Sequence, residues 1–428
     1  MRKVSLFACL LGLSLPLWAQ EIPLTSDGYT KHEPQWSPDG NWIVYQKDDS
    51  TGSGQIYKVP SAGGTEIALT SEDYQHWKPQ WSPDGNWVVC NALDATGHWQ
   101  IFTIPSGGGA RTALTNDDYT DSSPKWSPDG NSIVYMKSDT TGRWQVYTVP
   151  SGGGAETALT SDSDNHCFYP EWSPDGNWIA YYKNDATGYW QIYRVPSGGG
   201  AETPLTGDSY RHSYPQWSPD GDWLVYEKED TTGRFQIYKS PSGGGTETAL
   251  TSDDYQHHYP QWSPDGDWIA YQKDYLTGLS QIYAVPSTGG ADVPLTGDGY
   301  AHLVPQWSPD GNWLVYMKLD ATGFYQIYKV AFATGIEGTE TVSNQAGTIS
   351  ICPNPFATHA SIKYSGNGER DEISLQLYDI SGRLIRTLTP NDVSFGSDLL
   401  SGVYFLKVVG PEGGVTTGST LTKIVKLK

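Results

Sequence analysis

The sequence predicts an all-β protein composed mainly of one tandem repeat, and three observations predict it. The pentapeptide Trp-Ser-Pro-Asp-Gly occurs seven times, at spacings of 45 or 46 residues. Short apolar stretches alternate with turns rich in Gly and Pro, and beyond the first twenty residues no stretch shows a helical apolar period. Aromatic residues make up 13% of the chain, which supplies enough apolar surface for a large core.

Residues 1–19 have the pattern of a signal peptide. Arg2 and Lys3 precede a short apolar stretch, and Ala19 is a small residue suited to cleavage. This stretch is too short to span a membrane, and no other segment contains about 18 consecutive apolar residues, so we expect no transmembrane span. Three cysteines remain after export, and their odd number excludes a fully paired disulfide framework.

Each repeat divides into four short strands. The first ends at the Ser-Pro-Asp-Gly turn, a Thr-Gly turn follows the second, and a Gly-rich turn follows the third. Four strands in about 45 residues, repeated seven times, are typical of propeller blades, so we predict a seven-bladed β-propeller over residues 20–335. Residues 21–25 match the fourth strand of a repeat, and we expect them to complete the last blade and close the ring.

The repeat resembles the TolB-like propellers, whose units carry Trp-Ser-Pro-Asp-Gly followed by an apolar strand and an Ile-Tyr strand. The resemblance covers residues 21–335 and implies the fold more strongly than the function. TolB itself has an α/β domain before a six-bladed propeller, whereas this sequence has seven units and no such domain before them. We therefore do not expect a role in the Tol–Pal envelope system.

A second domain follows a linker at residues 336–348. Residues 349–428 contain no Trp and alternate short apolar stretches with Gly-containing turns, which predicts a small Ig-like β-sandwich. Pro-Asn-Pro at 353–355, Asp-Ile-Ser-Gly-Arg at 379–383, Leu-Ser-Gly-Val-Tyr at 400–404 and a Lys-Ile-Val-Lys ending resemble the C-terminal sorting domain of type IX secretion. The resemblance implies passage through that secretion machinery and a secreted or outer-membrane surface-attached product. An accessory module that stays attached is the alternative.

The charge of the chain excludes one class of partner. The formal net charge is −21, and residues 20–330 carry 17 Lys and Arg against 39 Asp and Glu. Such an acidic propeller is not expected to bind nucleic acid, because that binding relies on neutralising phosphates with basic side chains.

The candidate ligand-binding residues lie in the link before the first strand of each repeat. Six repeats carry a histidine in this link and the third carries an aspartate. In a propeller the link leads to the innermost strand, so we expect these side chains to surround the mouth of the central channel: His32, His76, Asp121, His166, His212, His257 and His302. A further aromatic column on the same face forms a candidate rim: Trp99, Trp144, Trp190, Phe235 and Tyr325.

Three interpretations of the histidine column remain open. Each histidine can hydrogen-bond to a neighbouring blade and serve only the fold. Alternatively, neutral imidazoles can hold a divalent metal, or protonated ones can bind anions. The sequence requires no cofactor.

Catalytic motifs are missing from the sequence. It contains no Gly-x-Ser-x-Gly, His-Glu-x-x-His or Cys-x-x-Cys motif. We therefore expect a binding or interaction protein whose ligand is a protein, a peptide or a glycan. Seven-bladed propellers of related repeat type include oligogalacturonate lyases, which use a metal, and this enzyme class is one alternative. A structural or adhesive surface component is the other.

Overall fold

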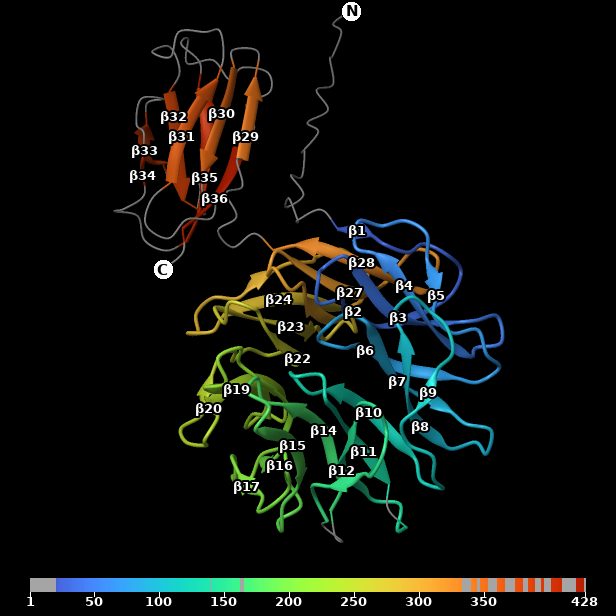
Figure 1. Ribbon diagram of the computed structural model, residues 1–428. Helices are drawn as coiled ribbons and strands as arrows, with labels where there is room; N and C mark the ends of the chain where they lie inside the picture. The colour runs from blue at the N-terminus through green and yellow to red at the C-terminus, as the bar shows by residue number, and fades with distance from the viewer. Residues whose placement is uncertain are drawn as a thin grey trace, which may run out of the picture. The chain divides into compact units, whose positions relative to one another are not determined.

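The computed structural model describes residues 21–332, except 139 and 162–164, and the strands that follow them. Within residues 21–332, seven four-stranded antiparallel sheets follow one another around a common axis (Figure 1). The innermost strand of each sheet contacts the innermost strands of both neighbouring sheets, so that the ring is closed. The predicted all-β class and the seven blades are confirmed.

The strands of the seven blades occupy equivalent positions in each repeat. The first strands are β2 (Lys31–Trp36), β6 (His76–Trp81), β10 (Asp121–Trp126), β14 (Cys167–Trp172), β18 (His212–Trp217), β22 (Gln256–Trp262) and β26 (His302–Trp307). The second strands are β3 (Trp42–Asp48), β7 (Trp87–Leu93), β11 (Ser132–Ser138), β15 (Trp178–Asn184), β19 (Trp223–Glu229), β23 (Trp268–Asp274) and β27 (Trp313–Leu319).

The outer half of each blade is formed by a long third strand and a very short fourth strand. The third strands are β4 (Gly54–Pro60), β8 (Trp99–Pro105), β12 (Trp144–Pro150), β16 (Trp190–Pro196), β20 (Phe235–Pro241), β24 (Ser280–Pro286) and β28 (Tyr325–Ala331). The fourth strands are β5 (Ile67–Ala68), β9 (Thr112–Ala113), β13 (Thr157–Ala158), β17 (Thr203–Pro204), β21 (Thr248–Ala249), β25 (Val293–Pro294) and β1 (Ile22–Pro23).

The repeated pentapeptide forms the turn between the first and second strands. In the first blade, Ser37 Oγ donates to Asp39 Oδ1 at 2.6 Å and accepts from the backbone N–H of Trp42 at 2.9 Å. Gly40 has a φ of 71°, a conformation that favours glycine. The Ser37 hydrogen bond is the main cause that lowers the pKa of Asp39, so the carboxylate stays ionised and keeps the turn bonded.

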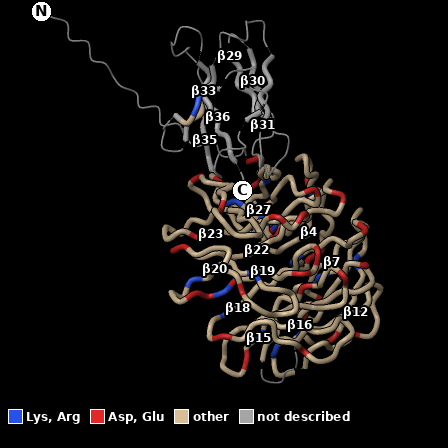
Figure 2. Tube along the Cα trace, turned by 90° about the vertical axis from the view of Figure 1, so that its left-hand side faces the viewer, with Lys and Arg blue, Asp and Glu red and all other residues tan. Residues whose placement is uncertain are grey.

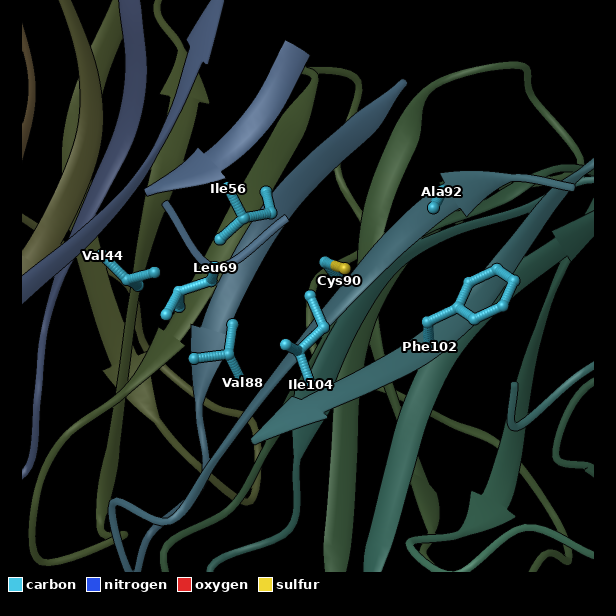
Figure 3. Close-up of a cluster of buried hydrophobic side chains, with 8 residues drawn as sticks. All are labelled: Val44, Ile56, Leu69, Val88, Cys90, Ala92, Phe102 and Ile104. Atoms are coloured by element: carbon cyan, nitrogen blue, oxygen red, sulfur yellow. The ribbon is translucent and has the colours of Figure 1, made fainter. Parts of the chain in front are cut away.

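The hydrophobic core lies between neighbouring blades. Val44 and Ile56 of the first blade pack with Val88, Cys90 and Ile104 of the second (Figure 3). All of these side chains are fully buried. Cys90 therefore serves as a small apolar residue of this core.

The tryptophan of the pentapeptide joins each blade to the one before it. Trp81 Nε1 donates to the backbone carbonyl of Gln35 at 3.3 Å, and the equivalent bond recurs at Trp126, Trp172, Trp217, Trp262 and Trp307. Trp36, at the junction of the last and first blades, is the exception. Its Nε1 is buried and has no hydrogen-bond partner among the described residues.

The N-terminal segment closes the ring, as predicted. Strand β1 pairs with β28, so the seventh blade takes its outer strand from the start of the chain. Glu21 bonds to Lys318 and lies 3.1 Å from His302. Gln326 Nε2 donates to the backbone carbonyls of Asp27 at 2.8 Å and Tyr29 at 3.0 Å. Residues 21–29 therefore make in the last blade the contacts that each other blade makes with its own following segment.

A second compact unit begins at Phe332. Its strands form two four-stranded antiparallel sheets, in agreement with a small β domain. The first sheet contains β29 (Glu340–Asn344), β30 (Gly347–Cys352), β31 (Ala360–Ser365) and β34 (Ser394–Phe395). The second contains β33 (Leu384–Leu388), β32 (Ser374–Asp379), β35 (Gly402–Val409) and β36 (Leu421–Lys426).

The paired strands extend into the segment predicted to be a linker. Strand β29 lies within the segment assigned to a linker, because residues 340–344 pair with residues 347–351 of β30. The predicted signal peptide, residues 1–19, lies outside the described residues. Among the residues that are described, no helix has the length and apolar character needed to cross a membrane.

Candidate functional site

The predicted histidine column divides between different positions of the first strand and its link. The position three residues before each first-strand proline is fully buried, and it holds Lys31, His76, Asp121, Cys167, His212, His257 and His302. His32 lies one residue after this position, and His166 lies one residue before it because its link is one residue longer; both are partly exposed. His32 and His166 therefore do not share the buried position of the other five predicted residues, and the seven side chains do not occupy one register.

His212 and His302 bond to carboxylates of their own blades, whereas His257 Nδ1 lies 2.7 Å from Thr251 Oγ1, which follows the fourth strand of the preceding blade. Nδ1 of His212 lies 3.0 Å from the carbonyl oxygen of Tyr210, and Nε2 lies 2.9 Å from Glu247 Oε1. His302 makes the equivalent contact with Glu21 at 3.1 Å. These contacts connect the link before the first strand to the start of the fourth strand. They stabilise the blade and leave both imidazoles fully buried.

Two of the buried histidines do not carry a charge near neutral pH. Burial, and then the nearby Arg111, lower the pKa of His76 to about 4. Burial likewise lowers the pKa of His257 to about 4, although Asp253 opposes this effect. Both imidazoles are neutral at pH 6, so the interpretation of the column as a ring of protonated histidines does not hold for them.

In most blades a lysine of the second strand lies between two carboxylates, one in the link before the first strand and one at the start of the fourth strand. Lys228 Nζ lies 2.5 Å from Asp208 Oδ2 and also bonds to Glu247. In the second blade the positions of the charges are exchanged. Ala92 stands where the other blades have the lysine, and Arg111 stands where they have the acidic residue of the fourth strand. Arg111 Nε lies 2.7 Å from Glu72 Oε2 and so provides the positive charge. The exchange preserves charge compensation, which indicates a structural ion-pair network. Figure 2 shows that Asp and Glu positions are spread over many parts of the propeller.

Two of these networks have the ligand types that a metal ion needs. Asp208, His212 and Glu247 form one group, and Glu21, Asp298 and His302 form the other, with the ligand atoms of each group within 4.8 Å of one another. In both groups a lysine ammonium already bonds to the two carboxylates. A divalent cation would have to displace Lys228 or Lys318, so the donor sets fit a metal less well than they fit the lysine.

The backbone facing the axis has an unusual conformation. The residue directly before each first-strand proline has a positive φ, between 48° and 56°, although it is not glycine: Glu33, Lys78, Ser123, Tyr169, Tyr214, Tyr259 and Val304. This left-handed conformation is uncommon for residues with a side chain, and it coincides with a register shift in every first strand. Such strain is retained where the surrounding structure enforces it, often at functional sites.

The preceding blade holds this conformation in place. The backbone N–H of Tyr259 donates to Glu227 Oε1 at 2.8 Å, and that of Val304 donates to Gln272 Oε1 at 3.3 Å. The N–H of Tyr169 meets the sulfur of Met136 at 3.2 Å. In these three blades the packing of the preceding sheet therefore helps to position the left-handed residue.

Three consecutive blades place tyrosines at this position, and the rings touch. The centroids of Tyr169 and Tyr214 lie 4.7 Å apart, and those of Tyr214 and Tyr259 lie 5.1 Å apart. Lys78 Nζ donates to Ser123 Oγ at 2.7 Å and lies 5.0 Å from the centre of the Tyr169 ring. Equivalent side chains on neighbouring blades can touch only where the blades converge, so this tyrosine arc faces the axis.

A second layer of side chains lies two residues further along the first strands. It contains Gln35, Gln80, Lys125, Glu171, Gln216, Gln261 and Gln306. Gln216 Nε2 donates to Glu171 Oε1 at 3.0 Å, and Lys125 Nζ lies 3.1 Å from the same oxygen. Contacts between equivalent positions again show that this layer faces the axis.

A buried carboxylate, that of Glu227, accepts the hydrogen bond from the backbone N–H of Tyr259 in the tyrosine arc. Glu227 is almost fully buried and lies 3.2 Å from His258 Nδ1, and it accepts a hydrogen bond from Ser213 Oγ at 3.2 Å. Burial alone would lower the pKa of His258, but the hydrogen bond and charge of Glu227 outweigh it and raise that pKa. The partly exposed imidazole therefore retains its proton more readily than a free histidine.

Two of the five predicted rim aromatics pack near the tyrosine arc. The ring centroid of Trp190 lies 5.6 Å from that of Tyr182, and Tyr182 contacts Tyr169 and Tyr214. The ring centroid of Phe235 lies 5.7 Å from that of His258.

The other three rim residues lie in blades without an axial tyrosine. Trp99 lies 5.3 Å from the exposed Trp77. The backbone N–H of Trp144 donates to His166 Nδ1 at 3.3 Å, and Tyr325 packs on the apolar core between the last and first blades.

Sequence reasoning missed the tyrosine arc because it searched for titratable residues. A signal was nevertheless present. The residue before the first-strand proline is of five different types in the seven repeats, whereas the proline and the tryptophan two residues after it do not change. A variable position beside invariant neighbours in a repeat indicates that the fold does not require one residue type there, so that its side chain can contact a ligand.

Asp121 is the one carboxyl in the buried column. Both of its carboxylate oxygens are buried without a hydrogen-bond partner. Burial is the main cause that raises the pKa of Asp121 to about 8; nearby Thr115 and Lys137 oppose this effect, and Asp117 and Glu156 add to it. The folded state therefore holds a proton that the unfolded chain releases, and stability falls as the pH rises from about 4 to about 8.

We predict that Asp121→Asn stabilises the protein at alkaline pH. The substitution should raise the melting temperature by roughly 2–4 °C at pH 8, because it removes the cost of keeping this site protonated, and should have little effect at pH 4. Thermal unfolding followed by circular dichroism measures both. Asp118→Asn, an exposed neighbour in the same link, is the control. Equal effects of the two substitutions at pH 8 would contradict the buried, protonated state.

The comparisons with known proteins agree on the propeller. The model of a family described as PD40, TolB beta propeller domain, matches residues 68–186, 161–274 and 215–397. Among curated proteins, none matches the chain by sequence.

Solved structures give the same fold. The oligogalacturonate lyase of Vibrio parahaemolyticus has a TM-score of 0.63 at 12% identity, covering 74% of this chain and 94% of the lyase. An oligogalacturonate lyase in complex with manganese has a TM-score of 0.62 at 14% identity, covering 74% of this chain and 93% of the other.

The propeller domain of the Trilobed protease from Pyrococcus furiosus has a TM-score of 0.55 at 13% identity, covering 71% of this chain and 95% of the domain. That domain is described as having an open velcro topology, whereas β1 completes the seventh blade here. At these identities the similarities concern the fold alone. The family match covers more than half of the chain, and the protein therefore belongs to the TolB β-propeller family.

Proposed function

We propose that this protein is an exported binding protein whose ligand lies on the propeller axis, against the tyrosine arc formed by Tyr169, Tyr214 and Tyr259. The single observation that carries the proposal is the left-handed backbone that presents these side chains. All seven repeats retain a left-handed residue at this position, and for Glu33, Tyr169, Tyr259 and Val304 the preceding blade bonds to its backbone N–H.

The chemistry of the axis supports binding more than catalysis. The tyrosine rings provide flat apolar contact and hydroxyl groups that donate and accept. Burial and the adjacent tyrosines raise the pKa of Tyr214, so its hydroxyl stays protonated and is not a ready base. The buried His212, His257 and His302 support the blades from outside this surface.

We predict that replacing the three arc tyrosines by alanine abolishes ligand binding. The full chain would be applied to a glycan array and a peptide array, and every positive feature re-tested with the triple variant. Signals should fall at least about tenfold, since aromatic residues at the centre of a binding surface dominate affinity. The matched control replaces the exposed Tyr29, Tyr300 and Phe324 by alanine and should keep the signals. Signals that survive the axial change and disappear in the control would refute the site.

We also propose that residues 1–19 direct export and that residues 349–428 direct passage across the outer membrane. The sequence motifs at both chain ends support this address. Deleting residues 349–428 should leave the protein in the periplasm, whereas the full chain should appear at the cell surface or in the medium. Fractionation and immunodetection distinguish the two locations. Surface delivery of the truncated chain would instead indicate an accessory module.

A second candidate function is a metal-dependent polysaccharide lyase of the oligogalacturonate type. The two histidine–carboxylate groups, together with the fold shared with a manganese-bound lyase, favour it. We expect the purified chain to contain no stoichiometric manganese or zinc, because lysines already compensate the carboxylates. Elemental analysis that finds about one ion per chain would favour the lyase.

A further inference from the structure

We propose that the axial wall binds a neutral oligosaccharide, with sugar rings stacked on the tyrosine arc and sugar hydroxyls bonded to the glutamines of the second layer. This inference rests on the proposed function and names the class of ligand.

The charge of the axial wall differs from that of the rest of the propeller. The two layers together contain two lysines and two glutamates, Lys78, Lys125, Glu33 and Glu171, in fourteen positions. The wall is thus formally neutral, although residues 20–330 carry an excess of 22 acidic groups. A ligand with a high negative charge would be repelled by the surrounding field, and a neutral one would not.

The edges of the first strands are unsuited to an extended peptide. Each first strand is the inner edge of its sheet and pairs only with the second strand. A peptide that adds to a sheet needs a row of free N–H and C=O groups along that edge. Each first strand instead carries a buried proline in its middle, directly after a left-handed residue. Both features interrupt the edge, so recognition falls to the side chains.

The side chains match a polyhydroxylated ring. Tyrosine rings offer electron-rich faces to the C–H groups of a sugar. The centroids of neighbouring rings along the arc lie 4.7 and 5.1 Å apart, a spacing that suits consecutive sugar units. Five of the seven positions of the second layer are glutamines, whose amides both donate and accept hydrogen bonds. A neutral sugar needs this combination of flat apolar contact and uncharged polar groups.

The test is calorimetric titration of the full chain with neutral hexasaccharides of glucose, mannose and xylose, with trigalacturonate as the acidic sugar and with the best peptide from the array. At least one neutral hexasaccharide should bind, and its affinity should change little with NaCl concentration because the ligand is uncharged. Tyr214→Ala should weaken binding by about tenfold and Gln261→Ala by about threefold, whereas Phe324→Ala should leave it unchanged.

The outcomes separate this inference from the proposed function. If only trigalacturonate or the peptide binds and Tyr214→Ala weakens that binding, the ligand class is wrong and the axial site stands. The opposite result is a neutral sugar that binds Tyr214→Ala as tightly as the wild type and fails to bind Phe324→Ala. That result would place the sugar away from the axis and would overturn both this inference and the axial site. If none of the probes binds, the oligosaccharide proposal fails.

Discussion

Ring closure is the constraint on which the rest of this structure depends. Each blade buries its apolar faces only against its two neighbours, so an open end would expose a core such as the one around Tyr45, Val315 and Ile327. The segment from Glu21 to Thr25 removes that open end by supplying the outer strand and the acidic partner of the last blade. The missing tryptophan bond at Trp36 marks this junction as different from the other six, among the residues described.

The closed ring also explains where functional variety can arise. Turn residues, inter-blade tryptophans and lysine–carboxylate networks are tied to neighbours in nearly every repeat, and a change in any of them leaves a buried group without its partner. The side chain before the first-strand proline is not part of these networks, and in blades such as those of Tyr259 and Val304 the preceding blade holds its backbone. Tyr214 and its equivalents can therefore differ from blade to blade without loss of the fold.

The sequence predicted the repeat, the seven blades and the closure because each depends on local turn chemistry and on a strict period. It could not place the candidate site. His257 and His258 are adjacent in sequence, yet one is fully buried beside Thr251 and the other is partly exposed beside Glu227. A one-residue difference in register decides between these environments, and the register becomes visible only when the first strand is paired. The left-handed residues are likewise invisible in the sequence, because Tyr and Val seldom adopt that conformation.

Hydrogen exchange at two matched amides tests the closure most directly. The N–H of Ile327 donates to Thr25 Oγ1 at 2.9 Å across the closure, and the N–H of Ile56 donates to Thr70 Oγ1 at 2.9 Å within the continuous first blade. Glu21→Gln and Glu66→Gln remove the carboxylate charge that pairs with Lys318 in the last blade and with Lys47 in the first blade. Because β1 is joined to β28 by noncovalent contacts alone, whereas β5 follows β4 directly in the chain, Ile327 should exchange much faster in Glu21→Gln than Ile56 does in Glu66→Gln. Equal acceleration at the two amides would contradict a ring that is closed by its N-terminal strand.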